Sequence, residues 1–181
     1  MKLIVLAAGA AILMSAGAEA RAPIDEIRLG VLAHDSGPFT RRKEHGAGIN
    51  GEIIFKAPRV LKFLGSPRPI LGASIATEDG ATNAVYAGLA WQVKLPSRFF
   101  VEGGAGIAVH DGDTQFKPTD KNINGTIYLG CRALFRLSAD LGYRLTDRLS
   151  VSAHADHMSN AGLCDDNEGL DNTGVRLGYR F

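Results

Sequence analysis

The sequence predicts an all-β protein, an eight-stranded antiparallel transmembrane β-barrel of the bacterial outer membrane. Three observations lead to this fold class. Eight segments alternate apolar and polar residues with a period of two, which places successive side chains on opposite faces of a strand. The connections alternate between long polar loops and short turns. Each strand has one apolar face, and charges recur on the other, as in barrels that face lipid outside and are polar inside.

The predicted strands lie near 27–34, 49–56, 70–77, 85–94, 99–110, 131–145, 151–159 and 171–181. The long loops are 35–45, 111–124 and 160–170, and the short turns are 95–98 and 146–148. The charges predicted to face the interior are Arg28, Glu52, Lys56, Glu102, Arg136, Asp140 and Arg176. An eight-stranded barrel is filled by its side chains, so we expect no pore and a closed network of neutralising charges.

A soluble β-sandwich would show the same alternation with the opposite sense, its apolar faces forming a core. Alternation alone does not separate the two architectures. The chain ends on Tyr179-Arg180-Phe181, which is similar to the aromatic terminus that serves as a sorting signal in bacterial outer-membrane barrels. This ending favours the barrel.

Residues 1–20 have the features of a signal peptide: Lys2, an apolar run over 3–14, and Ala18-Glu19-Ala20 as a cleavage site. The alternative, a membrane anchor, would need a longer apolar run. We therefore expect export through the periplasm and a single barrel domain over 21–181.

Composition restricts the partners. The formal net charge of the chain is +1, which gives no reason to expect a nucleic-acid partner. The two cysteines, Cys131 and Cys164, either form a disulfide, as exported proteins allow, or remain free thiols.

Three residues with catalytic potential share one otherwise apolar face. His157 and Ser159 are two residues apart near the end of one predicted strand, and Asp171 opens the next strand on the same face. Polar groups on a lipid-facing surface are costly, so their presence needs an explanation. One explanation is a hydrolytic triad with Ser159 as nucleophile, His157 as base and Asp171 as an exposed, solvated acid. The other is that these residues lie in headgroups and water, where polar groups cost little.

The run His157-Met158-Ser159-Asn160-Ala161-Gly162, followed by Asn167-x-Gly169 and Asp171, resembles the C-terminal signature of the PagL-type lipid A 3-O-deacylases. The resemblance implies an eight-stranded outer-membrane barrel that hydrolyses the ester-linked acyl chain at position 3 of lipid A, with lipopolysaccharide as substrate and no cofactor or metal. It implies His157 as base, Ser159 as nucleophile, Asn160 and Gly162 as oxyanion contributors, and Asn167 as support. The family's third catalytic residue is a glutamate, where this chain has the shorter Asp171. The oligomeric state stays open, a homodimer included.

Other interpretations remain at this point. A non-enzymatic structural or adhesive barrel would keep the fold without using the triad, whereas a soluble lipocalin-like binder conflicts with the charged inner faces. The acidic run 165–168 is either a calcium site or an exposed loop. The basic run Arg41-Arg42-Lys43 either meets lipid A phosphates or is simply a solvated loop.

Overall fold

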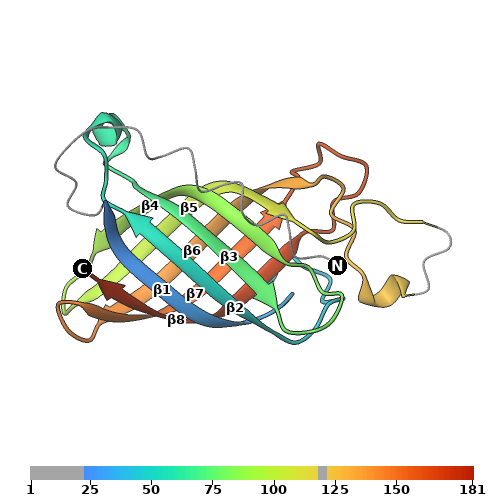
Figure 1. Ribbon diagram of the computed structural model, residues 1–181, viewed down its shortest axis with the longest axis horizontal. Helices are drawn as coiled ribbons and strands as arrows, with labels where there is room; N and C mark the ends of the chain where they lie inside the picture. The colour runs from blue at the N-terminus through green and yellow to red at the C-terminus, as the bar shows by residue number, and fades with distance from the viewer. Residues whose placement is uncertain (1–22, 118–121) are drawn as a thin grey trace.

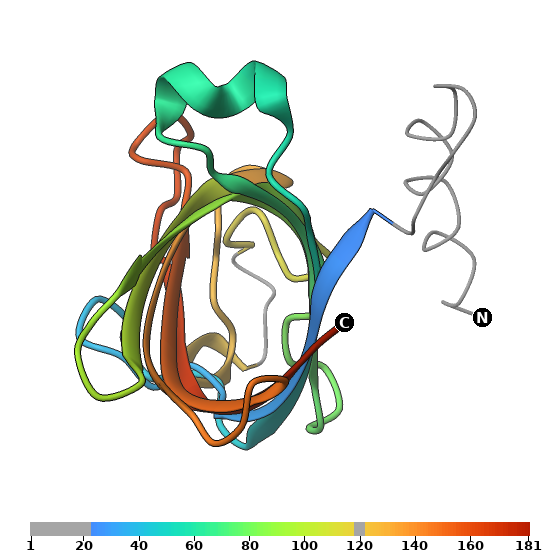
Figure 2. The same ribbon diagram turned by 90° about the vertical axis from the view of Figure 1, so that its left-hand side faces the viewer.

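The computed structural model describes residues 23–117 and 122–181. The predicted signal peptide, 1–20, lies outside the described residues. Eight strands follow one another in antiparallel order, and the first pairs with the last to close a barrel (Figures 1 and 2). The strands are β1 (Ile24–Ala33), β2 (Ala47–Phe55), β3 (Arg68–Ala76), β4 (Ala84–Lys94), β5 (Phe99–His110), β6 (Ala133–Arg144), β7 (Leu149–Ser159) and β8 (Leu170–Arg180). The predicted fold class is thus confirmed.

The connections sort to the two ends of the barrel. The loops that follow β1, β5 and β7 lie at one end, and the turns that follow β4 and β6 lie at the other, together with the C-terminus (Figure 1). Two short 3₁₀ helices, η1 (Arg59–Leu64) and η2 (Ile123–Gly125), interrupt the connections. No helix among the described residues has the length and apolar character needed to cross a membrane.

Much of the interior is polar, and its charged side chains neutralise one another. Arg28 donates to Glu102 at 2.6 Å and to Glu26 at 2.7 Å, and Arg176 donates to Asp140 at 2.6 Å. These side chains are almost completely buried, so each charge depends on its partner, as expected for ions removed from water. The network that the sequence predicts inside the barrel is therefore present.

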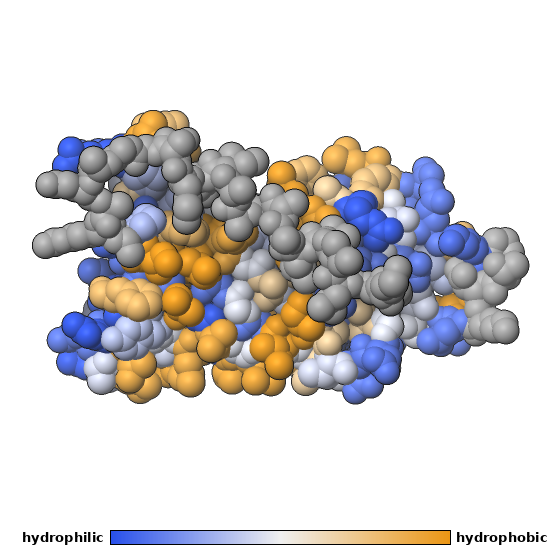
Figure 3. Space-filling model, in the orientation of Figure 1, coloured by the Kyte–Doolittle hydropathy of each residue, from blue (hydrophilic) through white to orange (hydrophobic). Residues whose placement is uncertain are grey.

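The exterior carries an apolar belt. Figure 3 shows hydrophobic side chains across the middle of the barrel wall and hydrophilic ones toward both ends. Exposed apolar residues of the strands include Leu29, Val31, Ile49, Ile107, Leu137, Leu141, Val175 and Leu177. Soluble monomers rarely expose so large an apolar surface to water. The belt therefore fits a lipid environment and excludes the soluble β-sandwich.

Three details differ from the sequence-based expectations. Cys131 lies before β6, which begins only at Ala133, because Gly130 turns the chain with a φ of +74° and Cys131 is held in a disulfide. Lys56 is exposed just beyond the end of β2 instead of facing the interior. The third difference is η1, a 3₁₀ helix that the sequence analysis did not predict; Gly65 ends it in the left-handed conformation.

Candidate active site

His157, Ser159 and Asp171 come together on the outer side of the barrel, at the end where the long loops lie. β7 and β8 pair so that His157 stands directly opposite Asp171. Nδ1 of His157 is 2.5 Å from Oδ1 of Asp171, and its Nε2 is 3.0 Å from Oγ of Ser159. The period-two geometry of the strand brings the histidine and serine to one face, and the register with β8 supplies the acid.

The hydrogen bonds define the tautomer. A carboxylate only accepts, so the proton between His157 and Asp171 belongs to Nδ1. Nε2 is then left with its lone pair toward the Ser159 hydroxyl, which can donate to it. This is the protonation pattern that a general base acting on a serine requires.

The histidine and the acid differ in exposure. The His157 side chain is 28% exposed, whereas that of Asp171 is only 3% exposed. The expectation of an exposed, solvated acid was therefore wrong. The β1–β2 loop covers Asp171: the backbone N–H of Phe39 donates to Oδ2 at 2.7 Å, and that of Ser36 donates to the Asp171 carbonyl at 2.9 Å.

The turn after Ser159 is built around Asn160. Its side-chain amide donates to the carbonyls of Leu129 at 2.9 Å and Asp166 at 2.5 Å, and its Oδ1 accepts the N–H of Gly162 at 2.8 Å. Asn167 Oδ1 accepts the N–H of Asn160 at 3.0 Å. The amides of Asn160 and Gly162 thus have partners within the loop, and the side chains of Asn160 and Asn167 stabilise the turn.

Two left-handed residues form this turn. Ala161 has a φ of +54° and Gly162 a φ of +78°. Cys164, just beyond, is joined to Cys131 in a disulfide with a Cα–Cα distance of 5.9 Å. The loop is therefore attached to the segment just before β6, by this bond to Cys131 and by the Asn160 contact with Leu129, which limits the freedom of the backbone next to Ser159.

The other conspicuous histidine, His154, has no comparable freedom. Its side chain is fully buried in the barrel interior, with Nδ1 3.0 Å from Asp140 and Nε2 3.2 Å from Asp156. Arg136 also pairs with Asp156 at 3.0 Å. Both ring nitrogens are occupied, so His154 belongs to the interior charge network.

The charged runs of the loops are largely engaged with one another. Glu168 lies 2.8 Å from Lys43 and 3.3 Å from Arg41, and Oδ2 of Asp166 accepts the N–H of Phe116. The basic run and the acidic run therefore serve in part to hold the loops together.

In the same β1–β2 loop, burial raises the pKa of the Asp35 carboxyl.

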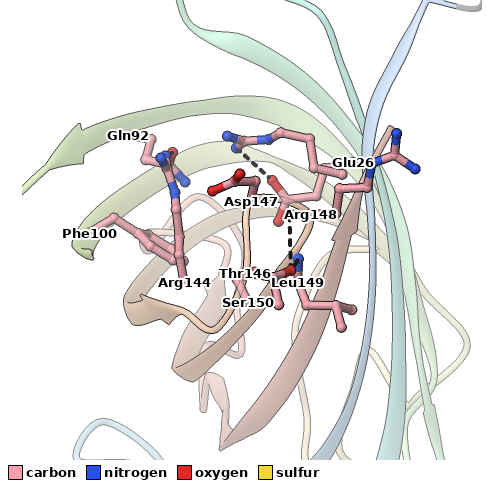
Figure 4. Close-up of a pocket in the computed structure, with 10 residues that line it drawn as sticks. Glu26, Gln92, Phe100, Arg144, Thr146, Asp147, Arg148, Leu149 and Ser150 are labelled. Carbon is pink, nitrogen blue, oxygen red and sulfur yellow. Dashed lines mark hydrogen bonds and ion pairs between the residues drawn. The ribbon is translucent and has the colours of Figure 1, made fainter.

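Two pockets lie at the opposite end of the barrel. One, of about 10 Å³, is surrounded by polar side chains including Glu26, Gln92 and Arg144 (Figure 4). The other, of about 420 Å³, is lined by residues such as Arg68 and Trp91. Neither of these two pockets includes a residue of the triad, which lies on the outward-facing side of β7 and β8.

Sequence reasoning missed the residues of the β1–β2 loop that contact the triad, namely Ser36, Gly37 and Phe39. The ring of Phe39 lies edge-on to that of His157, with centroids 5.5 Å apart. No spacing signal links 36–39 to 157–171, because their proximity follows from closure of the barrel between β1 and β8.

Known proteins are similar to this chain in sequence. Residues 71–180 match the family model described as lipid A 3-O-deacylase (PagL). The lipid A deacylase PagL of Bordetella bronchiseptica is 31% identical over 121 residues, which are 62% of this chain and 61% of that protein. The match thus spans less than two thirds of the relative's length.

Solved structures share the fold. The crystal structure of the outer membrane enzyme PagL superposes with a TM-score of 0.66 at 15% identity, covering 86% of this chain and 99% of that one. The N-terminal β-barrel domain of Pseudomonas aeruginosa OprF gives 0.54 at 12% identity, covering 87% and 98%. Neisserial surface protein A gives 0.53 at 9% identity, covering 88% and 98%. Since proteins with different names share the barrel, the fold alone does not define an activity. The family model covers more than half of the sequence, and the chain therefore belongs to the lipid A 3-O-deacylase (PagL) family.

Proposed function

We propose that this protein is an outer-membrane esterase that hydrolyses the acyl chain ester-linked at position 3 of lipid A. The observation that carries the proposal is the position of His157, with its two ring nitrogens within hydrogen-bond distance of Ser159 and Asp171. Family membership supports the substrate class, because the matching family is described by this reaction.

The chemistry follows from the arrangement. Ser159 Oγ attacks the ester carbonyl while His157 Nε2 takes its proton, and Asp171 stabilises the imidazolium that forms. Collapse of the tetrahedral intermediate breaks the ester bond, and His157 gives the proton to the leaving sugar oxygen, which thereby becomes a hydroxyl. Water, deprotonated by the same histidine, then attacks the acyl-enzyme and releases the fatty acid, which regenerates Ser159.

The developing oxyanion needs a donor close to Ser159. The turn 160–162 is the nearest backbone with a constrained conformation, and one such donor is worth ~3 kcal/mol. In the structure the N–H of Gly162 donates to Asn160 Oδ1. To act as an oxyanion donor, this N–H has to leave Asn160 and donate to the substrate oxygen instead. Asn160 and Asn167 act in this proposal as the supports that hold the turn.

The surroundings suit a substrate held in a membrane. Ser159 lies beside Phe135 of β6, which is half exposed on the same face, and Leu137 continues the apolar surface next to His157. A lipid A molecule in the outer leaflet would place its acyl chains along the belt and its ester bonds at the level of the loops. The site therefore reaches its substrate laterally, without a binding cavity inside the barrel.

The decisive experiment compares lipid A from cells that produce the wild-type protein with lipid A from cells producing Ser159→Ala. We expect the wild type to remove a hydroxyacyl chain from position 3 and Ser159→Ala to be slower by roughly 10⁴-fold or more. Ser150→Ala, on the same strand at the far end, is the matched control and should remain active. Mass spectrometry measures the loss, and resistance to unfolding in cold detergent checks that each barrel is folded.

Two results would contradict the proposal. An active Ser159→Ala would exclude Ser159 as the nucleophile. A folded wild type that leaves lipid A intact would favour the non-enzymatic barrel.

A further inference from the structure

Asp171 is buried on a face of β8 that becomes exposed farther along the strand. Val175 and Leu177 on the same face of β8 are 60% and 61% exposed, whereas Asp171 is 2% exposed. The segment that covers it is 36–39, from a loop that follows β1. This segment belongs to neither of the two strands that carry the triad. The pairing of β7 with β8 therefore does not explain why it contacts the acid.

Both oxygens of the Asp171 carboxylate have a defined partner. Oδ1 faces His157, and Oδ2 accepts the N–H of Phe39 at 2.7 Å. A carboxylate on a single-carbon arm can rotate about two bonds, and fixing the second oxygen selects the rotation that presents the first to the imidazole. A hydrogen bond to a charged acceptor is also stronger than one between neutral groups.

Gly37 provides the space for this arrangement. Its Cα packs directly against the Asp171 side chain, and a Cβ at position 37 would overlap Oδ2, Cβ and Cγ of Asp171. The glycine is required here for close approach, because any side chain would displace the carboxylate from its present position.

The segment itself is well anchored at the closing seam of the barrel. Ser36 Oγ donates to the Ala33 carbonyl at 2.7 Å and lies 2.8 Å from Oγ1 of Thr173. Thr173 Oγ1 is also 3.0 Å from the Ser36 carbonyl, and Ala33 pairs with Thr173 across β1 and β8. The clamp on Asp171 is therefore connected to the two strands that close the barrel.

We propose that Gly37 and the backbone amide of Phe39 are positioning groups for catalysis, which hold the Asp171 carboxylate in the orientation that His157 requires. This inference rests on the proposed hydrolytic function and adds the segment 36–39 to β7, β8 and the turn 160–162. It also explains how an aspartate serves at this position: the loop closes over the short side chain and holds it against the histidine.

The test uses Gly37→Ala in the full-length protein in detergent micelles, with Gly103→Ala as the matched control. Gly103 has open space where a Cβ would be added. We expect Gly37→Ala to lower kcat by about 100-fold with little change in KM, since a misplacement of about 1 Å costs this much. In the Asp171→Asn background the same substitution should cost less than about 3-fold, because residues acting as a unit are not additive.

A second measurement does not depend on lipid A. The Nδ1 proton of His157, bonded to a carboxylate, gives a downfield NMR signal that His157→Gln removes. Gly37→Ala should shift this signal in the same direction as Asp171→Asn, and Gly103→Ala should leave it in place. If the wild type proves inactive on lipid A, the proposed hydrolysis fails, but this signal still decides whether the loop positions the acid.

Ser36→Ala is a milder variant for use if Gly37→Ala does not fold, because it removes only the side-chain anchors of the loop. We expect it to change kcat and the NMR signal in the same sense and to a smaller extent. The inference is overturned if a folded Gly37→Ala keeps both kcat and the His157 signal. It is equally overturned if Gly37→Ala costs the same factor with and without the Asp171 carboxylate.

Discussion

Asp171 Oδ1 lies 2.5 Å from Nδ1 of His157, so the carboxylate contacts the imidazole directly although its side chain is one carbon shorter than the glutamate implied by the family resemblance. On the side of the carboxylate that faces away from His157, Gly37 and the Phe39 amide pack against it and leave no free space. The loop thus occupies the room that a longer side chain would need. The effects of changing Asp171 therefore follow from its packing as much as from its charge.

Asp171→Asn should lower kcat by ~10⁴-fold, as in a soluble triad. Because Asp171 is buried, little water reaches the site to stabilise the His157 imidazolium in place of the carboxylate. A much smaller loss would be expected of an exposed acid. The measurement is the rate of fatty-acid release from lipid A in micelles. Asp147→Asn, in the exposed β6–β7 turn, is the control and should leave the rate unchanged. Full activity of Asp171→Asn would mean that another group orients His157.

Asp171→Glu should reduce activity by about 10-fold. The longer arm must fit between His157 and the 36–39 segment, which already touches the aspartate, so the carboxylate is displaced from its present position. The same assay decides the matter, run beside the wild type at matched amounts of folded barrel. An increase in rate would show that the native carboxylate is too short.

Asn160→Ala should weaken the loop beside Ser159. It leaves the Leu129 and Asp166 carbonyls and the Gly162 amide without their present partner. The Leu129 carbonyl is buried, and an unsatisfied buried group costs about 1–3 kcal/mol. We expect a loss of about 10- to 100-fold in kcat and greater sensitivity of the 160–169 loop to protease. Unchanged activity with an intact loop would remove Asn160 from the supporting role.

The bond between Cys131 and Cys164 closes a separation of 33 residues. A loop of this size is expected to stabilise the folded protein by roughly 3–4 kcal/mol through the unfolded chain. Thiol labelling of the denatured, unreduced protein should modify neither cysteine, and prior reduction should expose both. Two labelled cysteines without reductant would exclude the bond.

Arg176→Met should destabilise the barrel without acting on the site. It leaves Asp140 and Glu52 buried next to an uncharged side chain, and breaking a buried ion pair costs about 3–5 kcal/mol. The temperature at which the barrel unfolds in detergent should fall, while the folded fraction keeps its specific activity. Arg59→Met, on the exposed η1, should change neither property.

The sequence by itself determined the eight strands, their apolar and polar faces, and the placement of His157 and Ser159 on one side of a strand. These features are local, because the period of two in β structure relates residue order directly to side-chain direction. Asp171 could be added because it opens the strand that follows β7 on the same predicted face, and consecutive strands of an antiparallel barrel pair. The motif around Asn160 led to the prediction of Asn160 and Gly162 as oxyanion contributors, and it gave no sign that both amides would have partners within the loop.

Only the tertiary structure decided what covers Asp171. The first loop reaches the triad because β1 pairs with β8 when the barrel closes, which joins residues more than 130 positions apart in hydrogen bonds. No local pattern encodes that approach. Burial of Asp171, the need for glycine at 37 and the role of the Phe39 amide all follow from this closure. The direction of the apolar faces was decided in the same way, since a closed barrel has an interior that its side chains already fill and leaves its apolar belt to the surrounding lipid.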